Sequence, residues 1–184
     1  MKDIETMLNK TNRKLIVASE KLFISNSLLK EFMKDHDILT FSYDTSMDLE
    51  ENSREVWKKF IMNLDYSYDK IVFMGHGVDC NIIYPLYRNK KLDFDAAVFV
   101  DYKNPDTLLI PPSYEEALRK SKVKIYSFST RNKKETPSAI IQSHQSLPWY
   151  HTTRSYRLAQ EIYGCIVYDT YQENYLSGAN SKLI

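Results

Sequence analysis

The chain has 184 residues, 43% of them hydrophobic, which is enough apolar material for one folded core of ordinary size. Its 25 Lys and Arg residues nearly balance 24 Asp and Glu residues, and this near-neutral charge disfavours a broad nucleic-acid-binding surface. Two cysteines are too few for a disulfide scaffold, and no apolar run approaches the ~18 residues of a membrane span, so we expect a cytoplasmic protein.

Six short apolar, β-branched runs recur along the chain and predict six strands. Several are almost continuously apolar rather than alternating, which is typical of strands covered on both faces of a parallel sheet. The predicted strands are Lys14–Ala18, Ile38–Tyr43, Lys70–Met74, Ala96–Asp101, Val123–Phe128 and Cys165–Asp169.

Helical patterns lie between these runs. Two of them begin with a capping-box pattern, in which a small polar residue precedes a glutamate by three positions. These pairs are Asn52 with Glu55, opening a helix to Leu64, and Ser113 with Glu116. A third helix, Thr152–Tyr163, is predicted to end at Gly164, because glycine is favoured just after the last helical turn.

The alternation of strand and helix predicts an α/β fold with a three-layer, doubly wound, mostly parallel sheet of about six strands. Residues 1–13 predict a leading amphipathic helix, and residues 170–184 predict a polar C-terminal tail. The chain shows neither an internal repeat nor a linker. Residues 1–184 are therefore predicted to form a single domain.

Two of the four glycines lie together after the third predicted strand, in Gly75-His76-Gly77. The first interpretation is a sharp strand-to-helix turn whose tip residue is strained. The second is a degenerate dinucleotide loop over Gly75–Cys80, with Asp101 placed to hold a ribose. The third is a turn that needs glycine only for its dihedral angles.

The residues of this turn also resemble a known family. The strand, Gly75-His76, the helix Val78–Tyr87 and the strand Ala97–Asp101 resemble the nucleophile elbow of the α/β-hydrolase superfamily. In that family the elbow is commonly Gly-His-Ser-x-Gly-Gly, followed by a strand that ends in Asp. The order of elements over residues 14–175 resembles the same family, and it implies an α/β-hydrolase-like core without a lid domain.

The resemblance also allows the catalytic positions to be compared. The chemistry needs a nucleophile, a histidine base, a carboxylate and two oxyanion-hole donors. The nucleophile position is Gly77, the acid position is Asn132, and the expected position of the base, Asp169–Asn174, holds no histidine. Ala18-Ser19-Glu20 stands where the family often has His-Gly. The resemblance therefore implies a degenerate member that lacks the catalytic triad.

We therefore predict a catalytically inactive α/β-hydrolase-like protein that acts by binding a protein partner or a small ligand. The predicted ligand-binding residues surround the vacant tip and are Ser19, Glu20, Gly75, His76, Gly77, Val78 and Asn132. Because exposed aromatic side chains are favoured binding anchors, the predicted partner surface is Trp149, Tyr150, Tyr171 and Tyr175. We expect no metal, no cofactor, no nucleic acid and no membrane, and the partner's identity and the oligomeric state stay open.

Two alternatives belong to other functional classes. The first is an esterase-type hydrolase whose nucleophile has moved to Asp79 or Cys80 and whose base is His76, His144 or His151. The second is nucleotide binding at the Gly75–Cys80 turn.

Asp79, His36 and the overall composition each allow one further interpretation. Asp79 is expected to loosen the helix crossing or to cap its helix. His36 is predicted to be a solvated turn residue. The Lys-, Asn-, Ile- and Tyr-rich composition suits an AT-rich genome, such as that of a low-GC bacterium or a phage.

Overall fold

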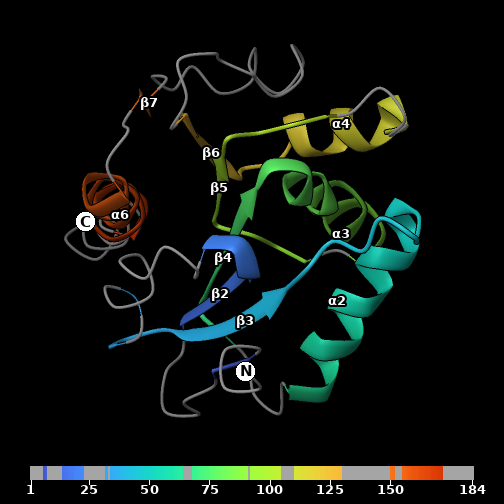
Figure 1. Cartoon of the computed structure of the whole chain (residues 1–184), viewed down its shortest axis with the longest axis horizontal. Helices are drawn as coiled ribbons and strands as arrows, with labels where there is room; N and C mark the ends of the chain where they lie inside the picture. Colours follow the sequence, from blue (N-terminus) through green and yellow to red (C-terminus); the bar gives the residue numbers. More distant parts are fainter. Residues whose placement is uncertain are drawn as a thin grey trace, which may run out of the picture.

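A computed structural model describes most of the predicted elements (Figure 1). It describes residues 6–7, 14–22, 32, 34–63, 68–90, 92–104, 110–129, 150–151 and 155–171.

The described strands form one seven-stranded sheet in the order β1-β3-β2-β4-β5-β6-β7. All neighbouring pairs are parallel except β1 with β3. The strands are β1 (Thr6–Met7), β2 (Lys14–Ser19), β3 (Asp37–Phe41), β4 (Lys70–His76), β5 (Ala96–Val100), β6 (Lys124–Ser129) and β7 (Tyr150–His151). The prediction of a mostly parallel α/β sheet is confirmed.

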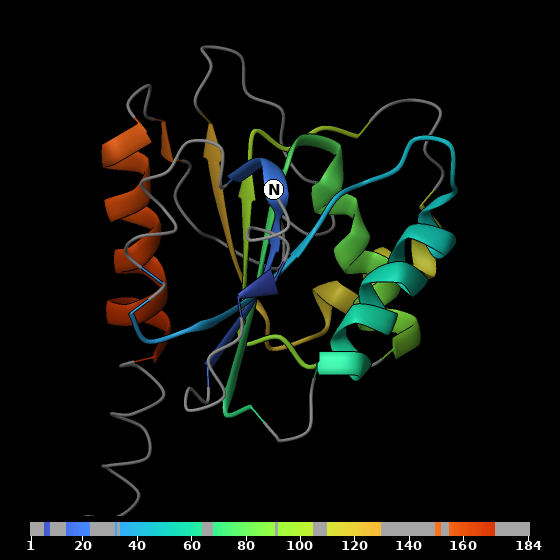
Figure 2. The same cartoon turned by 60° about the horizontal axis from the view of Figure 1, so that its bottom comes forward.

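Helices flank this sheet on both faces. The described helices are η2 (Glu20–Leu22), α2 (Leu49–Asn63), η3 (Gly77–Ile82), α3 (Ile83–Lys90), α4 (Pro112–Arg119), α6 (Ser155–Tyr163) and η4 (Gly164–Tyr171). Helices α2, α3 and α4 lie on one face, and α6 lies on the other, so that the sheet is the middle of three layers (Figure 2).

Two separate apolar clusters explain why the strand sequences are almost continuously apolar. Leu15 and Val17 of β2 belong to the cluster beneath α2, α3 and α4, whereas Ile16 and Ala18 belong to the cluster beneath α6 and η4. Successive side chains of a strand point to opposite faces. A strand buried on both faces therefore needs an apolar residue at every position, as the sequence predicted.

The sixth predicted strand, Cys165–Asp169, is wrong. These residues are helical, because η4 (Gly164–Tyr171) continues α6 as a π-type helix. Gly164 does not end the helix, and among the described residues Gly77 is the glycine with positive φ. In helical form the segment buries Cys165 and Ile166 against the sheet together with Ile162. Tertiary packing has therefore overridden the β propensity of this short β-branched run.

The helix starts also differ from the predicted capping boxes. Helix α2 begins at Leu49, and the Asp48 Oδ1 atom accepts the N–H of Glu51 at 2.8 Å, so Asp48 caps this helix. Asn52 instead holds the preceding loop against the helix, because its Oδ1 atom accepts a hydrogen bond from the N–H of Asp44 at 2.8 Å. Helix α4 begins at Pro112, and no side chain caps it. Proline at the first helical position already has helical φ, so the helix starts one residue before Ser113.

Both chain ends differ from their predictions within the described residues. The described part of the predicted leading helix, Thr6–Met7, is the edge strand β1. At the other end, Thr170 and Tyr171 belong to η4 and are buried, so the predicted polar tail cannot begin at residue 170. Backbone pairing with an existing sheet edge, and docking of a helix on a sheet, depend on distant residues that local periodicity does not reveal.

His36 is not a solvated turn residue. It is 2% exposed, and it contacts Tyr171, which lies 135 positions later in the chain. The prediction failed because the side chain that covers His36 comes from η4, a segment that the sequence analysis had assigned partly to a strand and partly to a tail.

Candidate functional site

The strand-to-helix turn after β4 has the geometry of a sharp elbow. Gly77 has φ of +60°, a left-handed conformation that favours glycine. Gly75 is required for a different reason, because a Cβ atom there would lie 2.6 Å from the Cα atom of Cys80. The 3₁₀ turn η3 starts at Gly77 and leads directly into α3. The turn therefore has a tip at positive φ, Gly77, and is tightly packed where it leaves the strand, at Gly75.

The tip itself carries no functional group. A Cβ atom built on Gly77 would meet no other atom within 4 Å, so there is open space where a side chain would stand. What the tip offers to a ligand is backbone alone. In the interpretation by resemblance this is the nucleophile's position.

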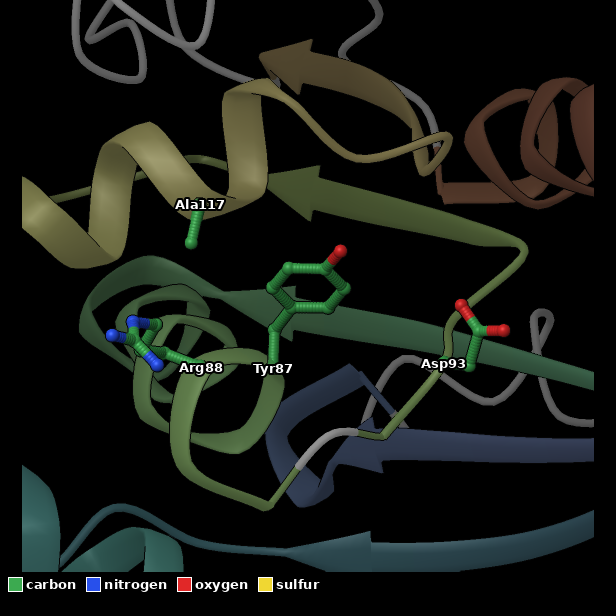
Figure 3. A pocket seen from close by; sticks show the side chains of 4 residues that line it. All are labelled: Tyr87, Arg88, Asp93 and Ala117. Atoms are coloured by element: carbon green, nitrogen blue, oxygen red, sulfur yellow. The ribbon is translucent and has the colours of Figure 1, made fainter.

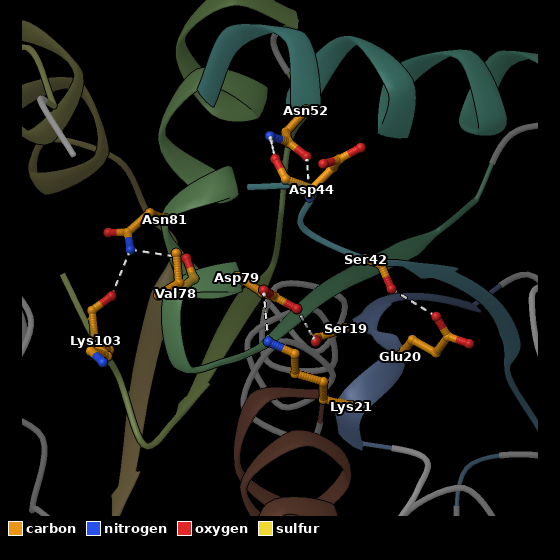
Figure 4. Close-up of polar contacts among 10 residues, drawn as sticks. All are labelled: Ser19, Glu20, Lys21, Ser42, Asp44, Asn52, Val78, Asp79, Asn81 and Lys103. Atoms are coloured by element: carbon orange, nitrogen blue, oxygen red, sulfur yellow. Dashed lines mark hydrogen bonds and ion pairs between the residues drawn. The ribbon is translucent and has the colours of Figure 1, made fainter. Parts of the chain in front are cut away.

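Asp79 joins the elbow to the end of the neighbouring strand β2 (Figure 4). Ser19 Oγ donates to Asp79 Oδ2 at 2.5 Å, and Lys21 Nζ lies 3.6 Å from Asp79 Oδ1. The Asp79 side chain has no exposed surface, whereas that of Lys21 is 54% exposed. No side chain caps η3 at its start, so the predicted capping role of Asp79 is wrong. That Asp79 loosens the helix crossing stays a prediction.

Cys80 lies behind the tip rather than beside it. It is fully buried, and its backbone packs against Gly75. Burial raises the pKa of the Cys80 thiol well above its usual value, and the negative charge of Asp79 raises it further. The thiol is therefore protonated and weakly nucleophilic near neutral pH.

His76 faces Asp101 across adjacent parallel strands. His76 ends β4 and pairs with Val100 at the end of β5, which places Asp101 next to it. His76 Nε2 lies 3.6 Å from Asp101 Oδ2, and the two side chains are 33% and 12% exposed. Asp101 has φ of +47°, the described non-glycine residue with positive φ. This pair lies beside the vacant tip.

The loop after β5 is held against the elbow by a buried polar network that the sequence analysis missed. Asn81 donates from Nδ2 to the carbonyls of Val78 and Lys103, at 2.9 and 2.8 Å (Figure 4). The hydroxyl of Tyr102 donates to Asn81 Oδ1 at 2.8 Å, and the N–H of Lys103 donates to the Gly77 carbonyl at 3.2 Å. The available signal was an asparagine among the apolar residues that follow the elbow.

The ends of β2 and β3 form the other side of this edge. Ser42 donates to Glu20 Oε2 at 2.7 Å, which places Glu20 at the rim. Burial raises the pKa of Tyr43, and the charges of Asp48 and Asp79 raise it further. We define the carboxyl edge as this group of residues at the carboxyl ends of the parallel strands: Ser19, Glu20, Lys21, His76, Gly77, Val78, Asp79 and Asp101.

The described structure does not place the side chains of the remaining predicted site residues at this edge. Asn132, His144, Trp149 and Tyr175 lie outside the described residues. Tyr150 and His151 form β7, whose backbone pairs with β6, and nothing further is described for their side chains. Tyr171 is 9% exposed and contacts His36, so this member of the predicted partner surface is instead part of the interior.

A cleft of about 430 Å³ lies at the opposite end of the sheet. Figure 3 shows Tyr87 at its centre between Arg88 and Asp93, with Ala117 of α4 across from it. Arg88 stands near the end of α3, and Asp93 precedes β5, so the cleft faces the amino ends of the strands. Its described lining residues include none of the predicted site residues.

No three or more His, Cys, Asp and Glu side chains within the described ranges are grouped so that they could hold a metal ion. No helix in the described part of the chain is both long and apolar enough to cross a membrane.

Comparison with known proteins identifies the fold. The chain is similar to a predicted CIB-like hydrolase from Thermoplasma acidophilum, with a TM-score of 0.63 and 12% identity over 88% of this chain and 89% of that one. A histone deacetylase from Saccharomyces cerevisiae aligns with a TM-score of only 0.40, at 14% identity over 86% of this chain and 77% of that one. No family model matches, and no curated protein is similar in sequence. The chain therefore shares the α/β fold of the Thermoplasma protein.

Proposed function

We propose that this chain is a catalytically inactive α/β-hydrolase-like protein that binds a small ligand or a protein partner at the carboxyl edge. The observation that carries this proposal is Gly77 at the elbow tip, with φ of +60° and open space around the missing side chain. Covalent hydrolysis at an elbow needs an oxygen or sulfur nucleophile at that point. Glycine keeps the backbone geometry without supplying one.

The two relocated nucleophiles considered from the sequence are poorly placed to replace it. Asp79 and Cys80 are both fully buried. In the described structure Asp79 Oδ2 accepts a hydrogen bond from Ser19, whereas Asp79 Oδ1 faces the Lys21 ammonium at 3.6 Å without a hydrogen bond. Burial keeps the thiol of Cys80 protonated. A substrate would have to displace packed side chains to reach either atom. These contacts support the inactive interpretation.

The ligand-contacting surface that we propose is smaller than the predicted set. Ser19 is buried and its hydroxyl is committed to Asp79. His76, Gly77 and Val78 are half-buried at the surface, and Glu20 is half-buried beside them. We infer that a ligand contacts these four half-buried residues, while Ser19 positions Asp79 beneath them.

We also infer that residues 1–184 form one domain without a lid. The support is that all described strands join one sheet. In addition, α4, the described helix between β5 and β6, contacts α3 on the sheet face instead of covering the carboxyl edge. Trp149, Tyr150 and Tyr175 remain our proposed partner anchors.

A second candidate function is favoured by the His76–Asp101 pair. A histidine beside a carboxylate can act as a general base toward water, with the carboxylate orienting the ring. At 3.6 Å and with 33% of its side chain exposed, His76 is open to a water molecule or a ligand. This alternative is a hydrolase that uses water in place of a side-chain nucleophile.

A panel of short-chain nitrophenyl esters separates these candidates. The proposal predicts the same background rate for the wild type and for Asp79→Asn, Cys80→Ala and His76→Ala. Turnover by the wild type that disappears in one of these variants would overturn the proposal. The variant that loses activity would identify the nucleophile, or would establish His76 as the base.

Nucleotide binding at Gly75–Cys80 is tested separately. A pyrophosphate would have to lie close to the backbone of Gly75, and the backbone of Cys80 already fills that space. We therefore expect no increase in the melting temperature with millimolar NAD. An increase that Gly77→Asp removes would support the nucleotide hypothesis instead.

A further inference from the structure

The C-terminal helical segment, Ser155–Tyr171, packs on the sheet face opposite α2, α3 and α4 (Figure 2). Its apolar contacts come from Ala159, Ile162 and Ile166, which join the cluster on this face of the sheet. The end of the segment is fastened by polar contacts as well. The hydroxyl of Tyr126 in β6 donates to Asp169 at 2.5 Å.

The second polar contact that holds the end of this segment is made by a buried histidine. His36 Nδ1 lies 2.7 Å from Asp35 Oδ1, and His36 Nε2 lies 3.0 Å from the hydroxyl of Tyr171. The rings of His36 and Tyr171 stack with centroids 5.8 Å apart, and Phe32 meets His36 edge-on at 5.2 Å. These contacts join the last residue of η4 to the turn before β3.

The contacts of this histidine define its proton positions. A carboxylate only accepts hydrogen bonds, so Nδ1 carries the hydrogen that is donated to Asp35. In the neutral ring Nε2 is then the acceptor for the Tyr171 hydroxyl. A second proton on Nε2 turns this acceptor into a donor, and the Tyr171 hydrogen loses its acceptor.

Burial and the neighbouring charges shift the pKa of His36 in opposite directions. Burial lowers the pKa of His36 below its usual 6.5, Asp35 in its own turn raises it, and Lys14 of β2 lowers it, for a net decrease. Lys14 Nζ lies 5.3 Å from the centre of the Tyr171 ring. Burial raises the pKa of Tyr171, as do the charges of Asp95 and Asp35, so Tyr171 keeps its hydrogen.

We propose that His36 is an acid-sensitive latch whose protonation releases the C-terminal helical segment from the sheet. The docked segment favours neutral His36, whereas a released segment leaves His36 in water, where the ring binds the second proton. Docking is therefore strongest above pH 6.5 and weakens as the pH falls below that value.

Hydrogen exchange read by mass spectrometry tests the latch in the intact chain. Exchange is measured between pH 7.5 and pH 5, a range in which exposed carboxylates titrate little. Each rate is corrected for the intrinsic exchange rate of an unfolded peptide at the same pH. We expect protection of residues 155–171 to fall below pH 6.5 by up to tenfold per pH unit, the limit for one proton. Peptides from β4 (Lys70–His76) are the internal control and should keep their protection.

Two variants make the test specific. His36→Gln keeps a polar side chain without a titrating ring, and it should remove the pH dependence from residues 155–171. Tyr171→Phe keeps the stacked ring without the hydroxyl, and it should lower their protection already at pH 7.5. The latch is overturned if wild-type protection is independent of pH, if His36→Gln shows the wild-type dependence, or if Tyr171→Phe leaves protection unchanged.

Discussion

Two histidines among the described residues lie beside an aspartate, and they differ in almost every other respect. His76 and Asp101 are 3.6 Å apart at the carboxyl edge, and a third of the His76 side chain is exposed. His36 and Asp35 are 2.7 Å apart, the His36 side chain is inaccessible, and its second ring nitrogen contacts Tyr171. The pair with the shorter distance is the one without room for a ligand.

This difference separates a structural histidine from a candidate functional one. Both ring nitrogens of His36 are used within the protein, so the ring can respond to protons but not to a substrate. His76 stands next to Gly77, where a Cβ atom would meet only open space. Exposure of the ring, more than the closeness of the carboxylate, therefore distinguishes the candidate functional histidine from the structural one.

The largest expected effect comes from breaking the turn that presents His76. Gly75→Ala places a Cβ atom 2.6 Å from the Cα atom of Cys80, a backbone contact that cannot relax by side-chain rotation. We expect a loss of about 3 kcal/mol or more in the free energy of unfolding, the upper end for overpacking. Urea denaturation measures it. The matched control is Gly164→Ala, which meets no atom within 4 Å and should stabilise its helix by about 0.5–1 kcal/mol.

Removing each histidine in turn compares the two pairs directly. His36→Ala should lower the free energy of unfolding by about 2–3 kcal/mol, because it leaves a cavity and removes one buried and one part-buried hydrogen bond. His76→Ala should change it by about 0.5 kcal/mol or less, as is usual at partly exposed positions. Equal losses in urea denaturation would contradict the distinction between the two sites.

The pH dependence of stability should follow His36 alone. Because burial lowers the pKa of His36, the unfolded chain binds more protons than the folded one below pH 6.5. Stability should therefore fall from pH 6.5 to pH 5.5 by up to about 1 kcal/mol. His36→Gln should flatten this part of the profile, whereas His76→Gln should retain it. A profile that follows His76 would show that the assignments are reversed.

A modest effect is expected at the elbow tip. Gly77→Ala meets no steric obstacle, but alanine at φ of +60° costs about 1 kcal/mol. Gly77→Asn should cost less, since asparagine tolerates this conformation better. Thermal unfolding of the two variants ranks them, and a neutral Gly77→Ala would show that the tip is relaxed.

The sequence allowed much of the fold to be predicted because both sheet faces are buried. The runs in β2, β4 and β5 could be read as parallel strands without distant contacts, since each is apolar at nearly every position. The run Cys165–Asp169 has the same local character and is helical. Only its docking beside Ile162 on the finished sheet distinguishes it.

The candidate site was predictable to a similar extent. The paired glycines indicated the elbow and its vacant tip. The contact of Ser19 with Asp79 joins residues 60 positions apart, and that of His36 with Tyr171 joins residues 135 apart. No local pattern encodes such contacts. Asn81 and Tyr102 were missed because a buried side-chain hydrogen bond depends on how two loops meet.

The vacancy of the elbow is tested most directly by intact-protein mass spectrometry after treatment with an alkyl fluorophosphonate. Such a reagent phosphonylates an activated nucleophile, and the denatured chain gives the baseline for nonspecific labelling. Our account predicts no mass increase above that baseline, because Gly77 supplies no attacking atom. A stoichiometric adduct on the folded protein, mapped to any residue of the carboxyl edge, would contradict it.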